Sequence, residues 1–251
     1  MSHRPHWDPS RPPGVRHRRA QGLFLLGLIA AGLALAPTAA RPDTKPSDLG
    51  LPQVLTLMDK FGQSLRTLSA RIAQKKYVAV LREFDPEERG LFYYDRRAGG
   101  PARLRKEIAE PAPNIITIDK GIVIAYEPRI KQARRIDLGK NKDKAEFLAI
   151  GIGQDPKKLE ETFHMKVLGM ETLEGQKTYL LELRPKSTKV GAFFSAIVLW
   201  LDAARGIPVQ QKFIEPNGDY ILVRFTEVKI NPKLAPGLFE LKLPKDVQML
   251  Q

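Results

Sequence analysis

The stretch from residue 90 to residue 138 constrains the fold more than any other part of the sequence. Five apolar or aromatic runs of strand length follow one another there, rich in the β-branched and aromatic residues that favour strands. Glycine- and proline-containing turn sequences separate the runs. We therefore predict an antiparallel meander, in which the short Asp119-Lys120-Gly121 connection makes residues 114–127 a tight hairpin. Its strands are expected at residues 91–95, 102–109, 114–119, 122–127 and 131–138.

The rest of the chain extends or covers this meander. Apolar residues between 51 and 68 follow spacings of three and four, which predicts an amphipathic helix with Pro52 in its first turn. Asp155 and Pro156 are typical of a helix start, so short helices are expected within 145–152 and 155–162. Turn signals at 174–175, 205–206 and 217–218 separate further strands. These strands are expected at residues 77–84, 165–170, 177–184, 196–202, 209–215, 220–229 and 236–241.

The predicted fold class is mainly β with some helix (α+β). About ten or eleven antiparallel strands in one sheet twist and curl, so we predict a strongly curved, incomplete antiparallel β-barrel. The amphipathic helix at 51–68 needs an apolar partner, and the sheet supplies one. Periodicity leaves open whether side chains fill the barrel or a ligand cavity remains.

Residues 1–40 have the three parts of a secretory signal peptide. A basic region ends at 16–19, an apolar run spans 23–35, and small residues stand at 38–40, so cleavage is expected after Ala40. An uncleaved anchor is the alternative, but the apolar run is shorter than the ~20 residues that span a bilayer. We predict a periplasmic protein with a flexible leader at 41–50 and a single domain at 51–251.

The charge of the chain favours no nucleic-acid partner. The formal net charge is +13, and five arginines and one aspartate in residues 1–40 supply +4 of it, which leaves +9 for the rest. Basic and acidic residues are interspersed there, which is typical of a solvated surface that allows transient contact with anionic membranes. No nucleic-acid-binding module accompanies the charge.

Residue types used in common catalysis are scarce. The chain has no cysteine, and His164 is the one histidine after residue 40. Metal sites and serine or cysteine nucleophiles usually need more. Acidic residues at 85–88 belong to a solvated turn, and those at 160–161 point apart on a helix. We expect no enzymatic activity, no metal and no cofactor; a hydrolase that works through carboxylates is the remaining alternative.

Several short segments follow one another in a distinctive order. They are LRTLSA (65–70), AQK (73–75), GLFYYDR (90–96), IDKG (118–121), AYEP (125–128) and KQA (131–133). Their order resembles that of the LolA-type periplasmic lipoprotein carriers and their outer-membrane lipoprotein-sorting superfamily. That family has a helix, a glutamine-rich first strand, a strand that ends in aromatic residues, a basic residue and proline, and then a pattern of the form dG…W.Y.P…Q. The similarity covers about residues 51–247.

The resemblance implies an apolar cavity that shelters the acyl chains of a lipoprotein in the aqueous periplasm, with the helices as a lid. It also implies an inner-membrane donor protein and an outer-membrane acceptor protein, and we expect the carrier to be a monomer. In the family an arginine at the end of the aromatic strand hydrogen-bonds the lid backbone; by position this is Arg96. The implied cavity and lid residues are Phe92, Tyr94, Leu55, Met58, Leu65, Ile116, Ile118, Ile122, Ile124 and Tyr126.

The sequence departs from the family pattern after Arg96. The family's basic residue is followed directly by proline, whereas four residues separate Arg96 from Pro101 here. Arg97, Arg103 and Arg105 therefore compete for the same role. The departure indicates a divergent member, whose cargo is a lipidated protein or another lipid.

Two further interpretations remain open at this point. A periplasmic sensor or scaffold on the same fold would bind an envelope protein in place of lipid. The apolar run that begins with Phe193 and Phe194 and continues through 196–201 is either a buried central strand or a rim that touches a membrane or partner.

Overall fold

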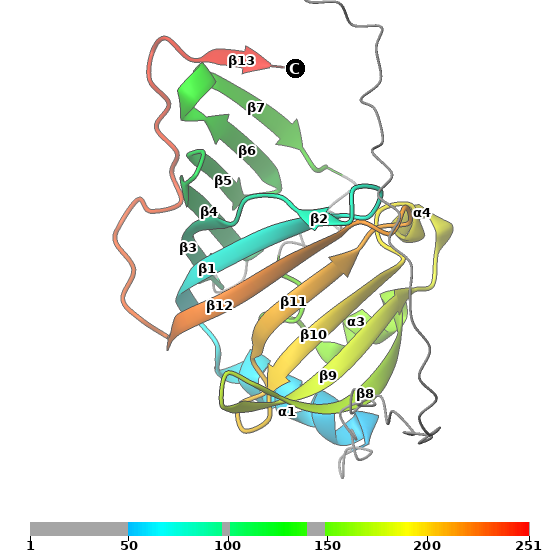
Figure 1. The fold of residues 1–251 in the computed structure, drawn as a ribbon. Helices are drawn as coiled ribbons and strands as arrows, with labels where there is room; N and C mark the ends of the chain where they lie inside the picture. The colour runs from blue at the N-terminus through cyan, green and yellow to red at the C-terminus, as the bar shows by residue number, and fades with distance from the viewer. Residues whose placement is uncertain (1–49, 97–100, 140–148, 251) are drawn as a thin grey trace, which may run out of the picture. The chain divides into compact units, whose positions relative to one another are not determined.

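One long strand, β1 (Thr67–Val78), joins the two halves of a single large sheet (Figure 1). The computed structural model describes residues 50–96, 101–139 and 149–250, which lie in the unit formed by residues 42–251. Within these residues thirteen strands form the sheet, in the order β13-β7-β6-β5-β4-β3-β1-β12-β11-β10-β9-β8, and β2 pairs with β1 off this path. The other strands are β2 (Glu83–Phe84), β3 (Glu88–Asp95), β4 (Arg103–Glu110), β5 (Asn114–Asp119), β6 (Ile122–Glu127), β7 (Gln132–Asp137), β8 (Phe163–Leu173), β9 (Gln176–Pro185), β10 (Ala196–Asp202), β11 (Pro208–Ile214), β12 (Tyr220–Ile230) and β13 (Gln248–Leu250).

The helices of the described residues are short and few. They are α1 (Leu51–Ser64), α3 (Pro156–Thr162), α4 (Thr188–Gly191) and a 3-10 turn, η1 (Pro128–Ile130). Helices α1 and α3 contact each other and β8, at the end of the sheet that is lowest in Figure 1. None of the helices in the described ranges has both the length and the apolar character needed to cross a membrane.

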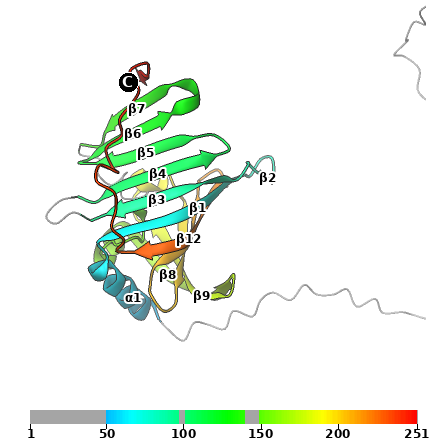
Figure 2. The same ribbon diagram turned by 90° about the vertical axis from the view of Figure 1, so that its left-hand side faces the viewer.

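The predicted fold class is confirmed: the protein is mainly β, with one large curved, open sheet. Every neighbouring pair of strands is antiparallel except β13 and β7, which are parallel. Figure 2 shows β1 between the meander β3–β7 and strand β12. Strands β2 and β13 are only two and three residues long, too short for the sequence pattern to predict them.

Most predicted hairpins and caps are confirmed. Strands β5 and β6 have the predicted bounds and pair across Lys120-Gly121, where φ is +52° and +78°. Positive φ at both central residues suits the right-handed twist of a two-residue hairpin. Asp155 caps α3 by accepting a hydrogen bond from the Lys157 N–H at 2.9 Å. The predicted helix at 145–152 lies partly outside the described residues.

The first helix ends four residues earlier than predicted, because Asn231 ends it. The Asn231 Nδ2 donates to the Ser64 carbonyl (3.0 Å), and its Oδ1 accepts from the N–H groups of Arg66 (2.7 Å) and Thr67 (3.2 Å). Asn231 has φ of +56°, a conformation that asparagine tolerates better than most residues. A side chain that follows β12 thus sets the junction of α1 and β1.

The strand predicted at 77–84 is wrong. Strand β1 continues only to Val78, residues 79–82 turn, and β2 has two residues. The Asp219 carboxylate accepts the Ala79 N–H at 2.8 Å, which holds the turn. Val80 and Leu81 are 86% and 62% exposed, so their apolar character suggested a strand where the chain actually bends.

The strand predicted at 236–241 is also wrong, because this segment crosses the outer face of the sheet without pairing. The Leu238 carbonyl accepts a hydrogen bond from Arg105 Nη1 (2.8 Å), and the Phe239 ring lies under the Arg103 guanidinium at 4.5 Å. The tail then reaches the edge of the sheet, where β13 pairs with β7.

We predict that Asn231→Ala lowers the free energy of unfolding by about 2 kcal/mol, because three backbone groups lose their side-chain partner. Chemical denaturation followed by circular dichroism measures this change. Asn231→Asp keeps the acceptor and loses only the donor, so it should cost less. An alanine variant as stable as the wild type would show that the junction does not depend on this residue.

Candidate functional site

An apolar cavity of about 310 Å³ opens on the inner face of the curved sheet. This volume lies at the lower end of the range of small-molecule pockets, roughly 300–1,000 Å³. Both halves of the sheet contribute to its wall. The lining residues are Ile72, Gln74, Phe92, Leu104, Lys106, Ile116, Ile118, Phe193, Phe194, Gln211, Phe213, Ile221, Val223 and Phe225.

Strand register explains why these residues share one face. Phe92 of β3 lies opposite Lys106 of β4, which lies opposite Ile116 of β5. Ile72 of β1 lies opposite Phe225 of β12 on the other side. Because side chains alternate between faces, every second residue of each of these strands lies on the inner face, and the cavity is lined by a subset of them.

Aromatic rings line the floor and the rim of the cavity. The rings of Phe92 and Phe225 meet edge to face, with centroids 5.6 Å apart, and so close the seam between the two halves. Phe194 packs against Phe213 at 5.5 Å. Phe193 lines the cavity and is 44% exposed, whereas strand β10, which follows it, is buried. The apolar run is therefore a buried strand with an aromatic rim in front of it.

Three of the residues that the family resemblance implied line this cavity: Phe92, Ile116 and Ile118. Tyr94 lies on the same face, 4% exposed, but does not line the cavity.

Ile122, Ile124 and Tyr126 do not lie with them. They pair in register with Asp119, Thr117 and Ile115, on the outer face of the sheet. The two-residue turn sets Val123 and Ala125 opposite Ile118 and Ile116. Val123 and Ala125 therefore face inward, in place of the neighbouring residues that the resemblance implied.

The residues that the resemblance implied in and after α1, namely Leu55, Met58 and Leu65, do not line the cavity. Met58 and Leu65 are 2% and 0% exposed and pack in two adjoining core clusters. Leu55 is half-buried and lines a more polar groove between α1 and α3. Helix α1 therefore covers part of the inner face beside the cavity.

Arg96 joins the end of β3 to the covering segments. Its Nη1 donates to the Gly62 carbonyl of α1 at 2.7 Å, and its Nη2 donates to the Gly153 carbonyl in the turn before α3. Gly153 has φ of +65°, and a Cβ there would lie 2.9 Å from Leu65 and 3.0 Å from the Tyr94 hydroxyl. Only glycine suits this close approach.

The competing arginines occupy other places. Arg103 pairs with Asp95 and stacks on Phe239, and Arg105 pairs with Glu107 and donates to the tail, all on the outer face. Arg97 lies outside the described residues.

Sequence reasoning missed the polar residues of the cavity wall. Gln74, Lys106 and Gln211 lie on the same face of their strands as the apolar residues two positions away. Strand alternation would therefore have identified them if the pairing register had been known. Gln211 is 1% exposed and donates to the Ile150 carbonyl at 2.7 Å, which fixes the turn at 149–153 beside the cavity.

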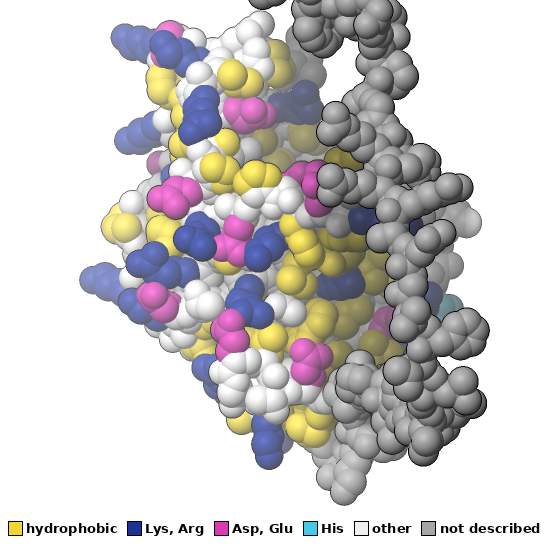
Figure 3. All heavy atoms as spheres, in the orientation of Figure 1, with side chains coloured by type: hydrophobic (Ala, Val, Ile, Leu, Met, Phe, Trp, Pro, Cys, Tyr) yellow, Lys and Arg dark blue, Asp and Glu magenta, His cyan; other side chains and the backbone are white. Residues whose placement is uncertain are grey.

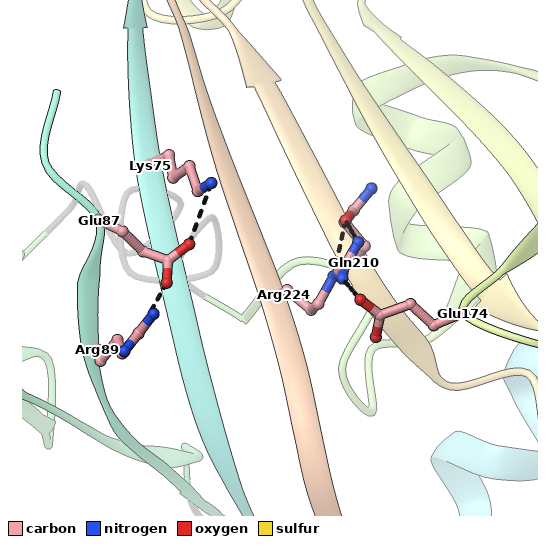
Figure 4. A network of polar contacts seen from close by, with 6 residues as sticks. All are labelled: Lys75, Glu87, Arg89, Glu174, Gln210 and Arg224. Carbon is pink, nitrogen blue, oxygen red and sulfur yellow. Dashed lines mark hydrogen bonds and ion pairs between the residues drawn. The ribbon is translucent and has the colours of Figure 1, made fainter. Parts of the chain in front are cut away.

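Charged side chains gather on part of the outer face, and several of them are paired. Lys, Arg, Asp and Glu side chains intersperse over β1 and β12 (Figure 3). Glu87 bridges Arg89 at 2.8 Å and Lys75 at 3.2 Å, while Arg224 joins Gln210 and Glu174 (Figure 4). Hydrogen bonds from Arg89 and then Lys75 hold the pKa of the Glu87 carboxyl below its ordinary value.

The lining of the cavity is mostly apolar, so the cavity can hold an apolar molecule. Throughout the described ranges, no three His, Cys, Asp or Glu side chains gather closely enough to hold a metal ion.

Comparisons with known proteins agree on one family. Residues 63–242 match the family model for the outer membrane lipoprotein carrier protein LolA. A curated outer-membrane lipoprotein carrier protein of Helicobacter hepaticus is 26% identical over 151 residues, which cover 60% of this chain and 68% of that protein.

Two solved structures are similar at lower identity. An uncharacterized conserved protein from Thermus thermophilus has a TM-score of 0.51 and 16% identity, covers 79% of this chain and 97% of its own, and shows the same fold. A chain of the Pseudomonas aeruginosa MucA/MucB complex has a TM-score of 0.46 and 12% identity, covering 76% of this chain and 61% of its own.

We predict that Ile116→Trp fills the cavity and weakens binding of an apolar fluorescent dye on the order of tenfold, because the dye loses apolar contact. Ile124→Trp, on the outer face of the adjacent strand, is the matched control and should bind like the wild type. Dye titration, with thermal melts to establish folding, measures both. Equal binding by the two variants would mean that the dye does not enter this cavity.

Proposed function

Because the chain belongs to the LolA family of outer membrane lipoprotein carriers, we propose that it holds the acyl chains of a lipidated protein, or of another lipid, in the apolar cavity and carries them toward the outer membrane. The family resemblance of the sequence is confirmed. The observation that carries the proposal is an apolar cavity on the inner face of the family's curved sheet. Each acyl methylene that the cavity shelters from water contributes about 0.8 kcal/mol to the binding free energy, so burial of an acyl chain in the cavity favours binding.

The proposal includes a location and a route. We place the mature protein in the periplasm, exported by the signal at residues 1–40, where it would take cargo from an inner-membrane donor and give it to an outer-membrane acceptor. The protein would act by binding alone and not as an enzyme. Its interspersed surface charges suit brief contact with anionic membranes.

Arg96 would hold the covering segments closed. Its two hydrogen bonds connect the end of β3 to α1 and to the turn at 149–153. Release of these bonds would let α1 and α3 move away from the core clusters that they now cover. The cavity would then extend along the inner face, which suits a longer acyl chain.

We predict that Arg96→Met speeds exchange of a bound apolar dye by about tenfold, because hydrogen bonds from a charged donor no longer favour the closed arrangement. Stopped-flow displacement of the dye measures the rate. Arg103→Met removes an arginine from the outer face and serves as the control. Identical exchange rates in wild type and Arg96→Met would remove the closing role of this residue.

A direct test is mass spectrometry of organic extracts from the mature protein, residues 41–251, purified from a bacterial periplasm without detergent. We expect a stoichiometric amount of acylated protein, phospholipid or fatty acid. A clean extract from a folded sample would contradict the carrier and favour the alternative, a periplasmic scaffold that binds an envelope protein. Crosslinking in the periplasm would then identify that protein.

A further inference from the structure

Lys106 has an unusual position at the centre of β4. Its neighbours two residues away, Leu104 and Ile108, are 6% and 4% exposed, and across the strands it faces Phe92 and Ile116. Among the described residues, it is the one charged side chain in the cavity wall. An apolar residue would suit the packing at this position, as it does at the positions on either side.

A chain of hydrogen bonds orients the lysine. The Lys106 Nζ donates to Gln74 Oε1 at 2.7 Å, and Gln74 Nε2 donates to Glu88 Oε2 at 2.8 Å. The bond to Glu88 fixes which end of the Gln74 amide faces the cavity, so that its oxygen meets the ammonium. Glu88 thus orients the partner of Lys106 through the Gln74 amide, and its negative charge favours the ionised form of Lys106.

The ammonium keeps donor capacity for a ligand. An ammonium has three N–H donors, and Gln74 uses one of them. Within the described ranges, no carboxylate lies within 4.0 Å of Lys106 Nζ. Two lysines elsewhere on the surface differ from it: Lys75 pairs with Glu87 (Figure 4), and Lys131 pairs with Asp246 at 2.6 Å.

The apolar surroundings of Lys106 disfavour its charged form when no anionic ligand is bound. Burial lowers the pKa of the Lys106 ammonium from its ordinary value, and the charge of Glu88 opposes this shift. A negative group placed in the cavity would act in the same direction as Glu88, because an opposite charge nearby favours the ionised form. The cavity is therefore better matched to an anionic guest than to a neutral one.

We infer that the cavity takes an amphiphile with an anionic head, a carboxylate or a phosphate, which binds Lys106 while its hydrocarbon chain lies along Phe92, Phe213 and Phe225. The inference rests on the proposed function and names the chemical class of its cargo. A free fatty acid or a lysophospholipid would supply this head. The volume of about 310 Å³ favours a guest with a single chain.

The test compares ligands that differ only in the head. Palmitate, methyl palmitate and palmitoyl-lysophosphatidylglycerol, which share one saturated C16 chain, are titrated into the mature protein by dye displacement. The wild type should bind palmitate or the lysophospholipid about tenfold more tightly than the neutral ester, since a hydrogen bond to a charged group adds to affinity. Whichever anion binds more tightly identifies the source of the head.

Variants connect the preference to the lysine. Lys106→Met keeps the length of the side chain and removes its charge, so it should bind the ester as the wild type does and lose the preference for the anion. Lys106→Arg should retain the preference. Lys75→Met, on the outer face, is the matched control, and thermal melts establish that each variant folds; Lys106→Gln replaces the methionine variant if that one does not.

The outcomes separate the carrier function from the nature of its cargo. If the folded wild type binds none of the three ligands, the proposed carrier function fails. If it binds ester and anions equally, or if Lys106→Met keeps the preference, the cavity still binds lipid but the anionic-head inference is overturned.

Discussion

The pairing of β1 with β3 on one side and β12 on the other determines which residues face inward across the whole sheet. A shift of one residue on either side would turn that half's apolar set outward. Phe92 and Phe225 would then no longer meet at 5.6 Å, and no cavity wall would form. The covering helix depends on the same register, because Arg96 reaches Gly62 only from the inner face of β3. The fold, the cavity and the contact of Arg96 with α1 thus depend on the same strand register.

Local signals were sufficient for much of the fold. The turn at Lys120-Gly121 and the Asp155 cap are set by residues next to one another, so the sequence could predict them. Arg96 could be placed on the inner face because parity from Phe92 counts along a single strand. The curved, open sheet followed from the number of strands.

Long-range contacts account for what could not be predicted. Asn231 ends a helix whose last residue, Ser64, lies 167 residues earlier in the sequence, and no pattern within 51–68 contains that information. Ile122 and Tyr126 look as apolar as Val123, and only pairing with β5 shows which face each occupies. Lys106 was missed for a related reason: a lysine within an alternating strand is usually read as solvent-facing, and its cavity exists only when the two halves of the sheet come together.

The parallel pairing of β13 with β7 affects how copies of the protein can associate with one another. The free edge of a sheet is a template to which another extended chain can add, and so a starting point for aggregation. On the β7 side, β13 covers the part of that edge at residues 132–134, and the ion pair of Lys131 with Asp246 holds the segment that leads to β13. Residues 248–250 therefore shorten the free edge along which copies of a protein with a large open sheet could pair.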